Sequence, residues 1–303
     1  LDRFAPIGDQ SRSSQPELFD YHRRLVLEAR TSSNDEDARA MASWWLGAIS
    51  IRQMTQGFNY RHDLLPAGES KPPPAELAWH ARGTGRVFAR TGWDTGAMWL
   101  SHIAGRYDES HAHQDQGSFT LFASDWLAVT ENIWSRSGIQ QGTEVHNVLR
   151  FERNDTSYRQ CASPANDRTV HQCEGTTSTT TVTPGANGAL TVVSNLTPAY
   201  GGNPAVTRWT RRLDFAARRL TVRDDYATGN GTSAVFQLQV PVQPTVSGST
   251  VTAGRLRVRV LQPANPVITL RNWNTTDAGE FNRGWRIDIG GGSGVYQVEL
   301  SEI

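Results

Sequence analysis

The residues best suited to chemistry gather in one stretch of the chain, residues 105–150. His111, His113 and Asp115 are spaced by two within it. Because alternate residues of an extended strand share a face, we expect these three side chains to point into one site. Two histidines at the surface, or held by hydrogen bonds within the fold, are the alternative that this spacing alone leaves open.

Two more groups of the kind that bind metals follow in the same stretch, Glu131 and His146. Neutral imidazole and carboxylate oxygen both suit Zn²⁺, so two histidines and one carboxylate from this stretch are compatible with a zinc site. A solvated carboxylate at a strand end and a histidine in a turn are the structural alternatives.

The order of several short motifs is more specific than any one of them. Residues 110–129 (SHAHQDQGSFTLFASDWLAV) contain the pattern His-x-His-x-Asp-x-x-Ser-Phe. Residues 6–9 (PIGD) and 90–93 (RTGW) precede it, and the pair His146-Asn147 follows it. Together these pieces resemble the heparinase II/III-like polysaccharide lyases, which include heparin and heparan lyases and related alginate lyases.

The resemblance implies a role for each histidine of this stretch. His111 matches a catalytic histidine that faces the substrate cleft, and His113 and His146 match two histidines that bind a structural metal, which we expect to be zinc. The metal carboxylate of the family is usually an Asp. Here Glu131 is the nearest acidic residue and becomes the predicted third ligand, although Thr130 is the strict positional match.

The resemblance also implies the reaction, β-elimination at a uronic acid. The uronate carboxylate must be neutralised, a base must remove the proton on the adjacent carbon, and an acid must protonate the departing oxygen. Histidine can act as the base because its pKa lies near neutrality. In the family a tyrosine and a neutralising Asn or His come from a helical toroid upstream of residues 6–9, so we expect an N-terminal toroid segment or chain as a partner. Tyr21, Tyr60 and Tyr107 match no family position.

Four other residues are candidates for substrate binding. Arg136 can meet a substrate carboxylate through a bidentate pair, although a solvated strand arginine is an equal alternative. Gln114 stands where an aromatic residue is common in the family. Arg90 and Trp93 can line the cleft or serve as the framework of the first strand.

The pattern of apolar residues predicts the elements that position this stretch. Residues 1–85 are predicted to be helical, with helices over 16–30 and 37–56 and a short helical piece over 75–81. Residues 86–303 alternate in short, turn-bounded segments that are typical of antiparallel strands. We therefore expect a mainly β chain, an antiparallel multi-sheet β-sandwich, preceded by what the resemblance implies are the last helices of an (α/α) toroid.

Two details of this organisation are open to direct comparison with a structure. The Thr-rich residues 177–183 are predicted to be an edge strand or a loop. Two or three helices build little core alone. We therefore expect the helical segment to expose an apolar face unless something covers it, including some of Trp44, Trp45, Leu46 and Ile49.

The composition limits the classes of partner. The 303 residues contain 30 Lys+Arg and 30 Asp+Glu, and this balance lacks the basic excess typical of nucleic-acid binding. No apolar run approaches the roughly 20 residues that span a bilayer, so we expect no membrane span. The chain has two cysteines, Cys161 and Cys173, and begins at Leu1. A disulfide would suit an exported protein, with two free thiols as the alternative. We expect a processed or truncated protein that is secreted or periplasmic in a bacterium.

The predicted function is a polysaccharide lyase acting on a uronate-containing polysaccharide or oligosaccharide. A non-catalytic carbohydrate-binding or assembly module and a uronyl epimerase are the alternatives, because both use similar residues. Only a lyase forms a C=C bond conjugated to the uronate carboxylate, and the ultraviolet absorbance of that product separates the lyase from the other two.

Overall fold

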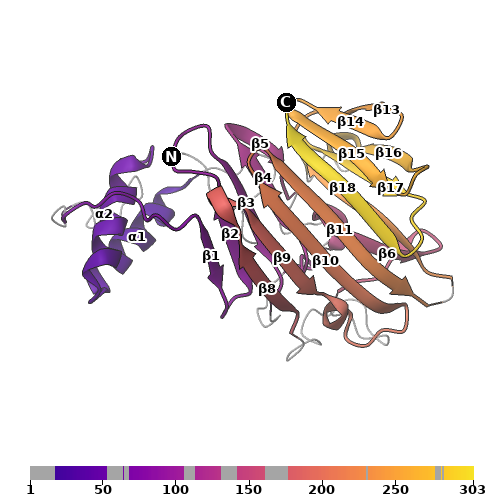
Figure 1. The fold of residues 1–303 in the computed structure, drawn as a ribbon, viewed down its shortest axis with the longest axis horizontal. Helices are drawn as coiled ribbons and strands as arrows, with labels where there is room; N and C mark the ends of the chain where they lie inside the picture. Colours follow the sequence, from indigo (N-terminus) through magenta and orange to yellow (C-terminus); the bar gives the residue numbers. More distant parts are fainter. Residues whose placement is uncertain are drawn as a thin grey trace. The chain divides into compact units, whose positions relative to one another are not determined.

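A computed structural model shows the architecture of the chain (Figure 1). It describes residues 18–52, 64, 68–105, 113–130, 142–160, 177–229, 231–276, 281 and 283–303. The chain divides into two compact units, and the described residues fall on either side of a boundary between Glu76 and Leu77. Cys161 and Cys173 lie outside the described residues, so the disulfide stays a prediction.

The first unit contains two helices, α1 (Asp20–Ser32) and α2 (Glu36–Ala48). The Asp35 side chain caps α2 by accepting hydrogen bonds from the backbone N–H groups of Asp37 and Ala38 at 2.9 and 3.1 Å. Both helices occur where the sequence predicts them. The second is shorter than the predicted span of 37–56, because the backbone becomes extended directly after Ala48.

The apolar side chains of this unit form a small core of their own. Leu27 of α1 and Leu46 of α2 are buried together with Ile49. Leu46 and Ile49, two of the four residues named for an exposed face, are therefore buried between the helices, whereas Trp44 and Trp45 are half-buried. The exposed apolar side chains of the helices are others: Phe19, Leu25 and Met41.

The second unit consists of three antiparallel sheets (Figure 1). The first sheet has the order β1-β2-β3-β4-β5, with β1 (Ala78–Ala81), β2 (Arg86–Arg90), β3 (Met98–Ile103), β4 (Phe119–Ala123) and β5 (Asp125–Ala128). The second sheet has the order β13-β14-β15-β18-β11-β10-β9-β8, with β8 (Thr179–Pro184), β9 (Leu190–Asn195), β10 (Val206–Ala216), β11 (Arg219–Thr228), β13 (Thr245–Ser247), β14 (Thr250–Ala253), β15 (Leu256–Gln262) and β18 (Val295–Glu302). The third sheet has the order β16-β17-β12-β6-β7, with β6 (Leu149–Arg153), β7 (Thr156–Ser157), β12 (Ser233–Val240), β16 (Val267–Asn272) and β17 (Trp285–Gly290).

Short helical turns connect some of these strands: η2 (Thr143–Val145), η4 (Ala186–Gly188), η5 (Thr197–Tyr200) and α3 (Trp273–Thr276). The predicted fold class is thus confirmed: the chain is mainly β, its sheets are antiparallel, and its two longer helices come first.

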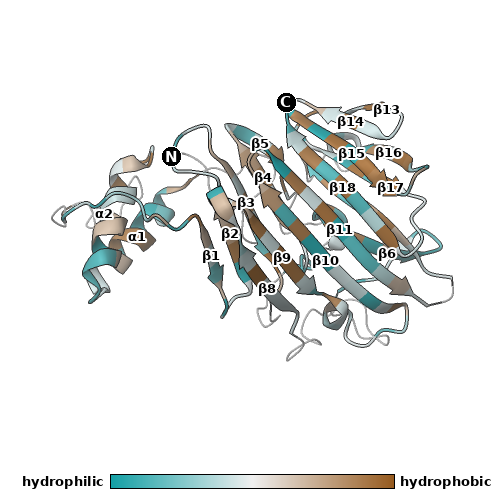
Figure 2. Ribbon diagram, viewed as in Figure 1, coloured by the Kyte–Doolittle hydropathy of each residue, from teal (hydrophilic) through white to brown (hydrophobic). Residues whose placement is uncertain are grey.

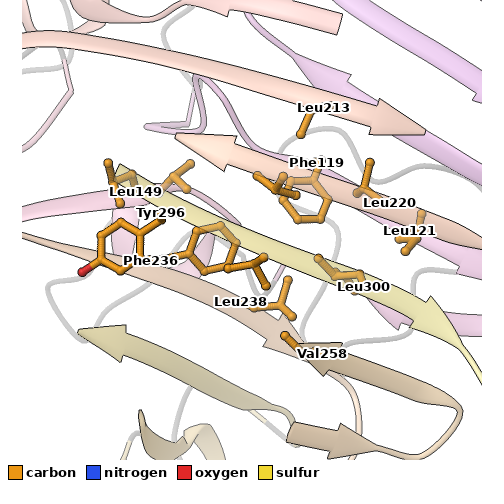
Figure 3. Packing of buried hydrophobic residues seen from close by; sticks show 14 of the residues in the cluster. Phe119, Leu121, Leu149, Leu213, Leu220, Phe236, Leu238, Val258, Tyr296 and Leu300 are labelled. Carbon is orange, nitrogen blue, oxygen red and sulfur yellow. The ribbon is translucent and has the colours of Figure 1, made fainter. Parts of the chain in front are cut away.

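Alternation along the strands explains how the sheets stack. In β18 every second residue is buried, and Tyr296, Val298 and Leu300 point inward. The hydropathy of the eight-stranded sheet changes from residue to residue in the same way (Figure 2). The inward residues meet Phe236 and Leu238 of the third sheet in one apolar core (Figure 3). This burial of apolar surface is the main force that holds the sheets together.

Two local expectations have opposite outcomes. Residues 75–81 are predicted to form a short helical piece, and this is wrong because the chain forms strand β1 there. Trp79 lies opposite Phe88 of β2, and cross-strand pairing outweighs the helix propensity of the Ala, Glu and Leu residues. The Thr-rich segment, in contrast, forms β8 at the edge of the eight-stranded sheet, which is one of its two predicted outcomes.

Candidate functional site

Three of the predicted site residues lie outside the described residues: His111, Glu131 and Arg136. Their roles therefore stay predictions. The structure places the other five predicted residues, and they fall into two groups.

His113 and His146 lie side by side. Their ring centroids are 5.2 Å apart with 43° between the ring planes, and both side chains are buried. His113 precedes β4, and His146 follows the short helix η2, so two separate loops bring the rings together. Two imidazoles this close are compatible with two ligands of a single metal.

A small cavity of about 20 Å³ borders both rings. Its other lining residues include His102, Asp115 and Arg86. A cavity of this size holds about one water molecule or one ion. Burial raises the pKa of the Asp115 carboxyl, and the charges of Arg86 and His113 oppose that rise.

The backbone conformation that places His113 and Asp115 at this cavity differs from the predicted one. The sequence predicts an extended strand that carries both residues on one face, but the described residues 113–118 form bends and a turn before β4 begins. The prediction of a strand is wrong at these positions. Gly117 has a φ of 91°, a backbone conformation that favours glycine and that turns the chain.

Thr130 holds the His146 ring. Its Oγ1 lies 2.5 Å from His146 Nδ1 and donates a hydrogen bond to the Val145 carbonyl at 3.2 Å. When the hydroxyl proton lies on the carbonyl, Nδ1–H is the donor to Thr130 and the lone pair of the ring is on Nε2. A hydrogen bond of this kind orients a metal-binding histidine.

The described residues place two possible metal ligands, His113 and His146, beside a small cavity. Two imidazoles and a cavity of ionic size fit a bound cation. Thr130 occupies the position that strictly matches the metal carboxylate of the resembled family, and its hydroxyl contacts His146. Within the described ranges, no group of three His, Cys, Asp or Glu side chains is arranged to hold a metal. The third predicted ligand, Glu131, is outside these ranges.

His102 is a buried histidine that the sequence analysis missed. Its Nδ1 lies 2.9 Å from the Ser118 carbonyl, and its Nε2 lies 2.9 Å from Ser194 Oγ of the neighbouring sheet. The carbonyl can only accept, so Nδ1 carries the proton and Nε2 accepts from Ser194. Burial, together with the charge of Arg211, lowers the pKa of His102 from 6.5 to about 3. His102 is therefore a neutral residue that links β3 to β9.

Arg211 and Asp224 form the strongest ionic contact of the site's framework. Both side chains are fully buried, and the guanidinium makes two parallel bonds to the carboxylate, at 2.8 and 2.7 Å. Arg211 Nη1 also donates to the carbonyls of Gly117 and Asn147, at 2.7 and 2.6 Å. One guanidinium thus ties together the segment that follows His113 and the segment that contains His146.

The sequence contains a pattern from which the ion pair between Arg211 and Asp224 could have been predicted. Arg211 falls between Trp209 and Leu213 on the inward face of β10, where a charged residue needs a buried partner. Asp224 is its cross-strand neighbour on β11.

Buried amides secure the loop around His146 from the other side. The side chain of Gln237 donates to the His146 carbonyl at 2.7 Å. Asn147 accepts a hydrogen bond from the backbone of Gln239 at 2.6 Å and donates to the Phe119 carbonyl at 2.7 Å. These bonds join the first and third sheets and fix the backbone on which His146 is mounted.

The remaining predicted substrate-binding residues lie in different places. Gln114 is buried next to His113, and its Oε1 has no hydrogen-bond partner in the part of the chain that the structure describes. Arg90 packs its guanidinium 3.9 Å from the ring centre of Trp93 and donates to the Gly92 carbonyl at 2.5 Å. Burial lowers the pKa of Arg90.

Arg90 and Trp93 do not line the cavity between the two histidines. Arg90 ends β2, and Arg86, which does line the cavity, begins it. Arg90 is four residues along the strand from Arg86, a distance of roughly 13 Å. A substrate contact by Arg90 or Trp93 stays a prediction, and the geometry shows a stacked pair in the turn after β2.

Comparison with known proteins gives a result at the level of the fold. No family model matches the chain, and no curated protein matches it by sequence. Among solved structures, a heparinase III is similar over 99% of this chain, with a TM-score of 0.66 and 13% identity. A heparan sulfate lyase from Pedobacter heparinus is similar over 99%, with a TM-score of 0.65 and 14% identity. A chondroitin AC lyase from Streptomyces coelicolor is similar over 92%, with a TM-score of 0.50 and 10% identity.

The chain therefore has a heparinase-like polysaccharide lyase fold, and the predicted resemblance is confirmed at that level. It covers 44% of each of the first two structures and 41% of the third, so it spans less than half of their length.

Proposed function

We propose that the protein is a polysaccharide lyase that cleaves a uronate-containing polysaccharide by β-elimination, and that this chain supplies the β-sheet side of the active site. The observation that carries the proposal is the anchored pair His113 and His146 in a lyase fold. His113, one of the pair, lies two residues from His111 in the sequence, where the base is expected.

In this proposal His111 is the catalytic residue of the chain. Its imidazole removes the proton on the carbon next to the uronate carboxylate. The electron pair of that C–H bond forms the new C=C bond, and the glycosidic C–O bond breaks with its electrons moving to the departing oxygen. A tyrosine from an N-terminal toroid segment or chain donates the proton to that oxygen, and an Asn or His from the same part neutralises the carboxylate.

The framework explains how a base at position 111 can be held in place. His113 is buried against His146, and the loops that carry the two rings are tied by Arg211, Gln237 and Asn147. Catalytic groups lose large rate factors when they move by about 1 Å, so a rigid neighbour two residues away is a useful anchor.

A zinc ion bound by His113, His146 and Glu131 is part of the proposal. Its role is structural, since it would fix the two loops next to the cleft. Thr130 supports this ion indirectly, because its hydroxyl group contacts His146 Nδ1 and Nε2 is then the proposed metal-binding nitrogen.

The substrate contacts and the location complete the proposal. Arg136 and Gln114 are proposed to contact the uronate polymer, as are Arg90 at the end of β2 and Trp93 in the segment that follows it. We propose that the protein is secreted or periplasmic, as expected for an enzyme that acts on large polysaccharides. The helices that the structure describes are all too short or too polar to cross a membrane.

The test is an assay of the intact protein on alginate, heparan sulfate and chondroitin sulfate. Ultraviolet absorbance of the conjugated product, together with hydrogen exchange into the substrate from deuterated water, separates the possible functions. Absorbance growth on at least one polymer supports the lyase. Exchange without absorbance indicates an epimerase, and binding with neither indicates a carbohydrate-binding module, so both results contradict the proposal.

A further inference from the structure

A second and larger hollow lies at the edge of the β-sandwich. It is a groove of about 770 Å³ between the hairpin that joins β1 to β2 and the edge strand β8. The volume is within the range of about 300–1,000 Å³ that is typical of ligand sites. In Figure 1, β8 runs beside the first strands of the first sheet.

The lining of this groove is rich in hydroxyl groups and carries one cation, Arg82, since burial and the charge of Arg82 lower the pKa of His80. The hairpin contributes His80 and Arg82, and the sheet edge contributes a row of hydroxyl side chains: Thr177, Ser178, Thr179, Thr180 and Thr181. No Asp or Glu side chain is among the described lining residues. Arg82 is exposed and forms no ion pair with a described residue, so its charge is available to a ligand.

The base of the groove is formed by closely packed backbone. A Cβ atom on Gly85 would lie 2.3 Å from the Cα of Gly105, so the hairpin and the end of β3 can approach each other only because both residues are glycine. Ser178 N–H donates to the Gly105 carbonyl at 3.2 Å, and Thr180 Oγ1 donates to the Ala104 carbonyl at 3.3 Å. These contacts give the groove a fixed shape.

We propose that this groove binds an acidic stretch of polysaccharide, carboxylated or sulfated, at a distance from the sugar that reacts. Arginine pairs with carboxylate and sulfate through charge-assisted hydrogen bonds, and threonine hydroxyls bond to sugar hydroxyls and sulfate oxygens. This inference rests on the proposed lyase function for its choice of ligand. The two sites are also close in the sequence, because Gly105 precedes His111 by six residues.

Two substitutions test the groove without touching the histidine site. Arg82→Glu reverses its charge. Gly83→Trp fills it, since a side chain at Gly83 meets nothing within 4 Å and enters open space. Arg257→Glu is the matched control, because Arg257 is an exposed strand arginine on β15, outside the groove.

The measurement is calorimetric titration of the intact protein with a uronate-containing dodecasaccharide, sulfated and unsulfated, and with its carboxyl-reduced, unsulfated counterpart. Arg82→Glu is expected to weaken binding of the acidic oligosaccharides by about tenfold, the loss of one charge-assisted contact. Gly83→Trp is expected to weaken it by at least about tenfold, because the indole occupies the groove. Arg257→Glu is expected to stay within about twofold of the unsubstituted protein, as for an exposed charge. The neutral oligosaccharide is expected to bind weakly to every variant.

Unchanged affinity in both groove variants overturns the inference. So does an equal loss in Arg257→Glu, which indicates attraction by overall charge, and so does tight binding of the neutral oligosaccharide. The outcome is independent of the lyase assay. If the groove variants weaken binding but no ultraviolet product forms, the proposed lyase activity is contradicted and the proposed binding site is retained. If an ultraviolet product forms but the groove variants bind as the unsubstituted protein does, only the proposed binding site is contradicted.

Discussion

At the residue scale, the candidate site depends on how single polar groups hold its histidines. Thr130 orients His146 through Nδ1, and His102 joins the same region to the next sheet as a neutral ring. Both residues are buried, so their hydrogen bonds count in the stability of the fold as well as in the geometry of the site. Each leads to a prediction about stability.

Replacing Thr130 by Val keeps the shape of the side chain and removes the hydroxyl. Because His146 Nδ1 then loses its partner, the free energy of unfolding is expected to fall by about 1–3 kcal/mol. Thr130→Ser retains the hydroxyl and is expected to lose less. Denaturant unfolding of the two variants measures the difference, and equal stability of Thr130→Val and the unsubstituted protein would refute the role of this hydroxyl.

The depressed pKa of His102 predicts how stability depends on pH. The folded state binds the proton only near pH 3, whereas the unfolded chain binds it near 6.5, so acid favours unfolding. The contribution of His102 is complete above about pH 6.5 and is lost as the pH falls towards 3. His102→Gln, which can keep hydrogen bonds without titrating, is expected to flatten the decline of unfolding free energy over this window. An identical slope in the two proteins contradicts the assignment.

At the element scale, much of the fold can be predicted from the pattern of residues. Alternation along segments such as 256–262 and 219–226 predicts strands with one buried face, and the capping Asp35 marks the start of α2. Strand β1 cannot be predicted in the same way, because its stability comes from pairing with β2 and not from its own residues.

The residues of the candidate site also differ in whether the sequence predicts them. Local motifs identify His113 and His146, since their types and order resemble a known pattern. Gln237 and Gln239 cannot be predicted, because alternation alone assigns them to a wet face. They are buried because a loop distant in the sequence covers that face of β12.

The buried arginine of β10 offers a matched comparison within one strand. Arg211→Met leaves the Asp224 carboxylate buried without its partner and removes two bonds to the loops of the site, so the expected loss is about 3–5 kcal/mol. Arg212→Met breaks the half-exposed pair with Asp214, and the expected loss is below about 1 kcal/mol.

Thermal and chemical unfolding of these two variants test this prediction. Similar losses in Arg211→Met and Arg212→Met would show that the buried pair does not have the structural importance assigned to it.

At the scale of the whole molecule, the chain combines a helical unit with a larger β unit in a lyase fold, and it spans less than half the length of the solved structures that it resembles. Its balanced charge is compatible with an acidic polymer as ligand only if positive charge is exposed locally, as that of Arg82 is in the groove. The central claim, however, concerns the reaction, and the reaction depends on His111.

The most direct test is the rate of ultraviolet product formation by the intact protein and its His111→Ala variant on the polymer that it degrades. The account predicts a fall in turnover of roughly two to four orders of magnitude, the usual scale for an acid–base group. Zinc content and melting temperature are expected to stay unchanged in His111→Ala, whereas His113→Ala is expected to lose both metal and stability. Full activity of His111→Ala, or loss of its metal, would contradict the assignment of the two histidines.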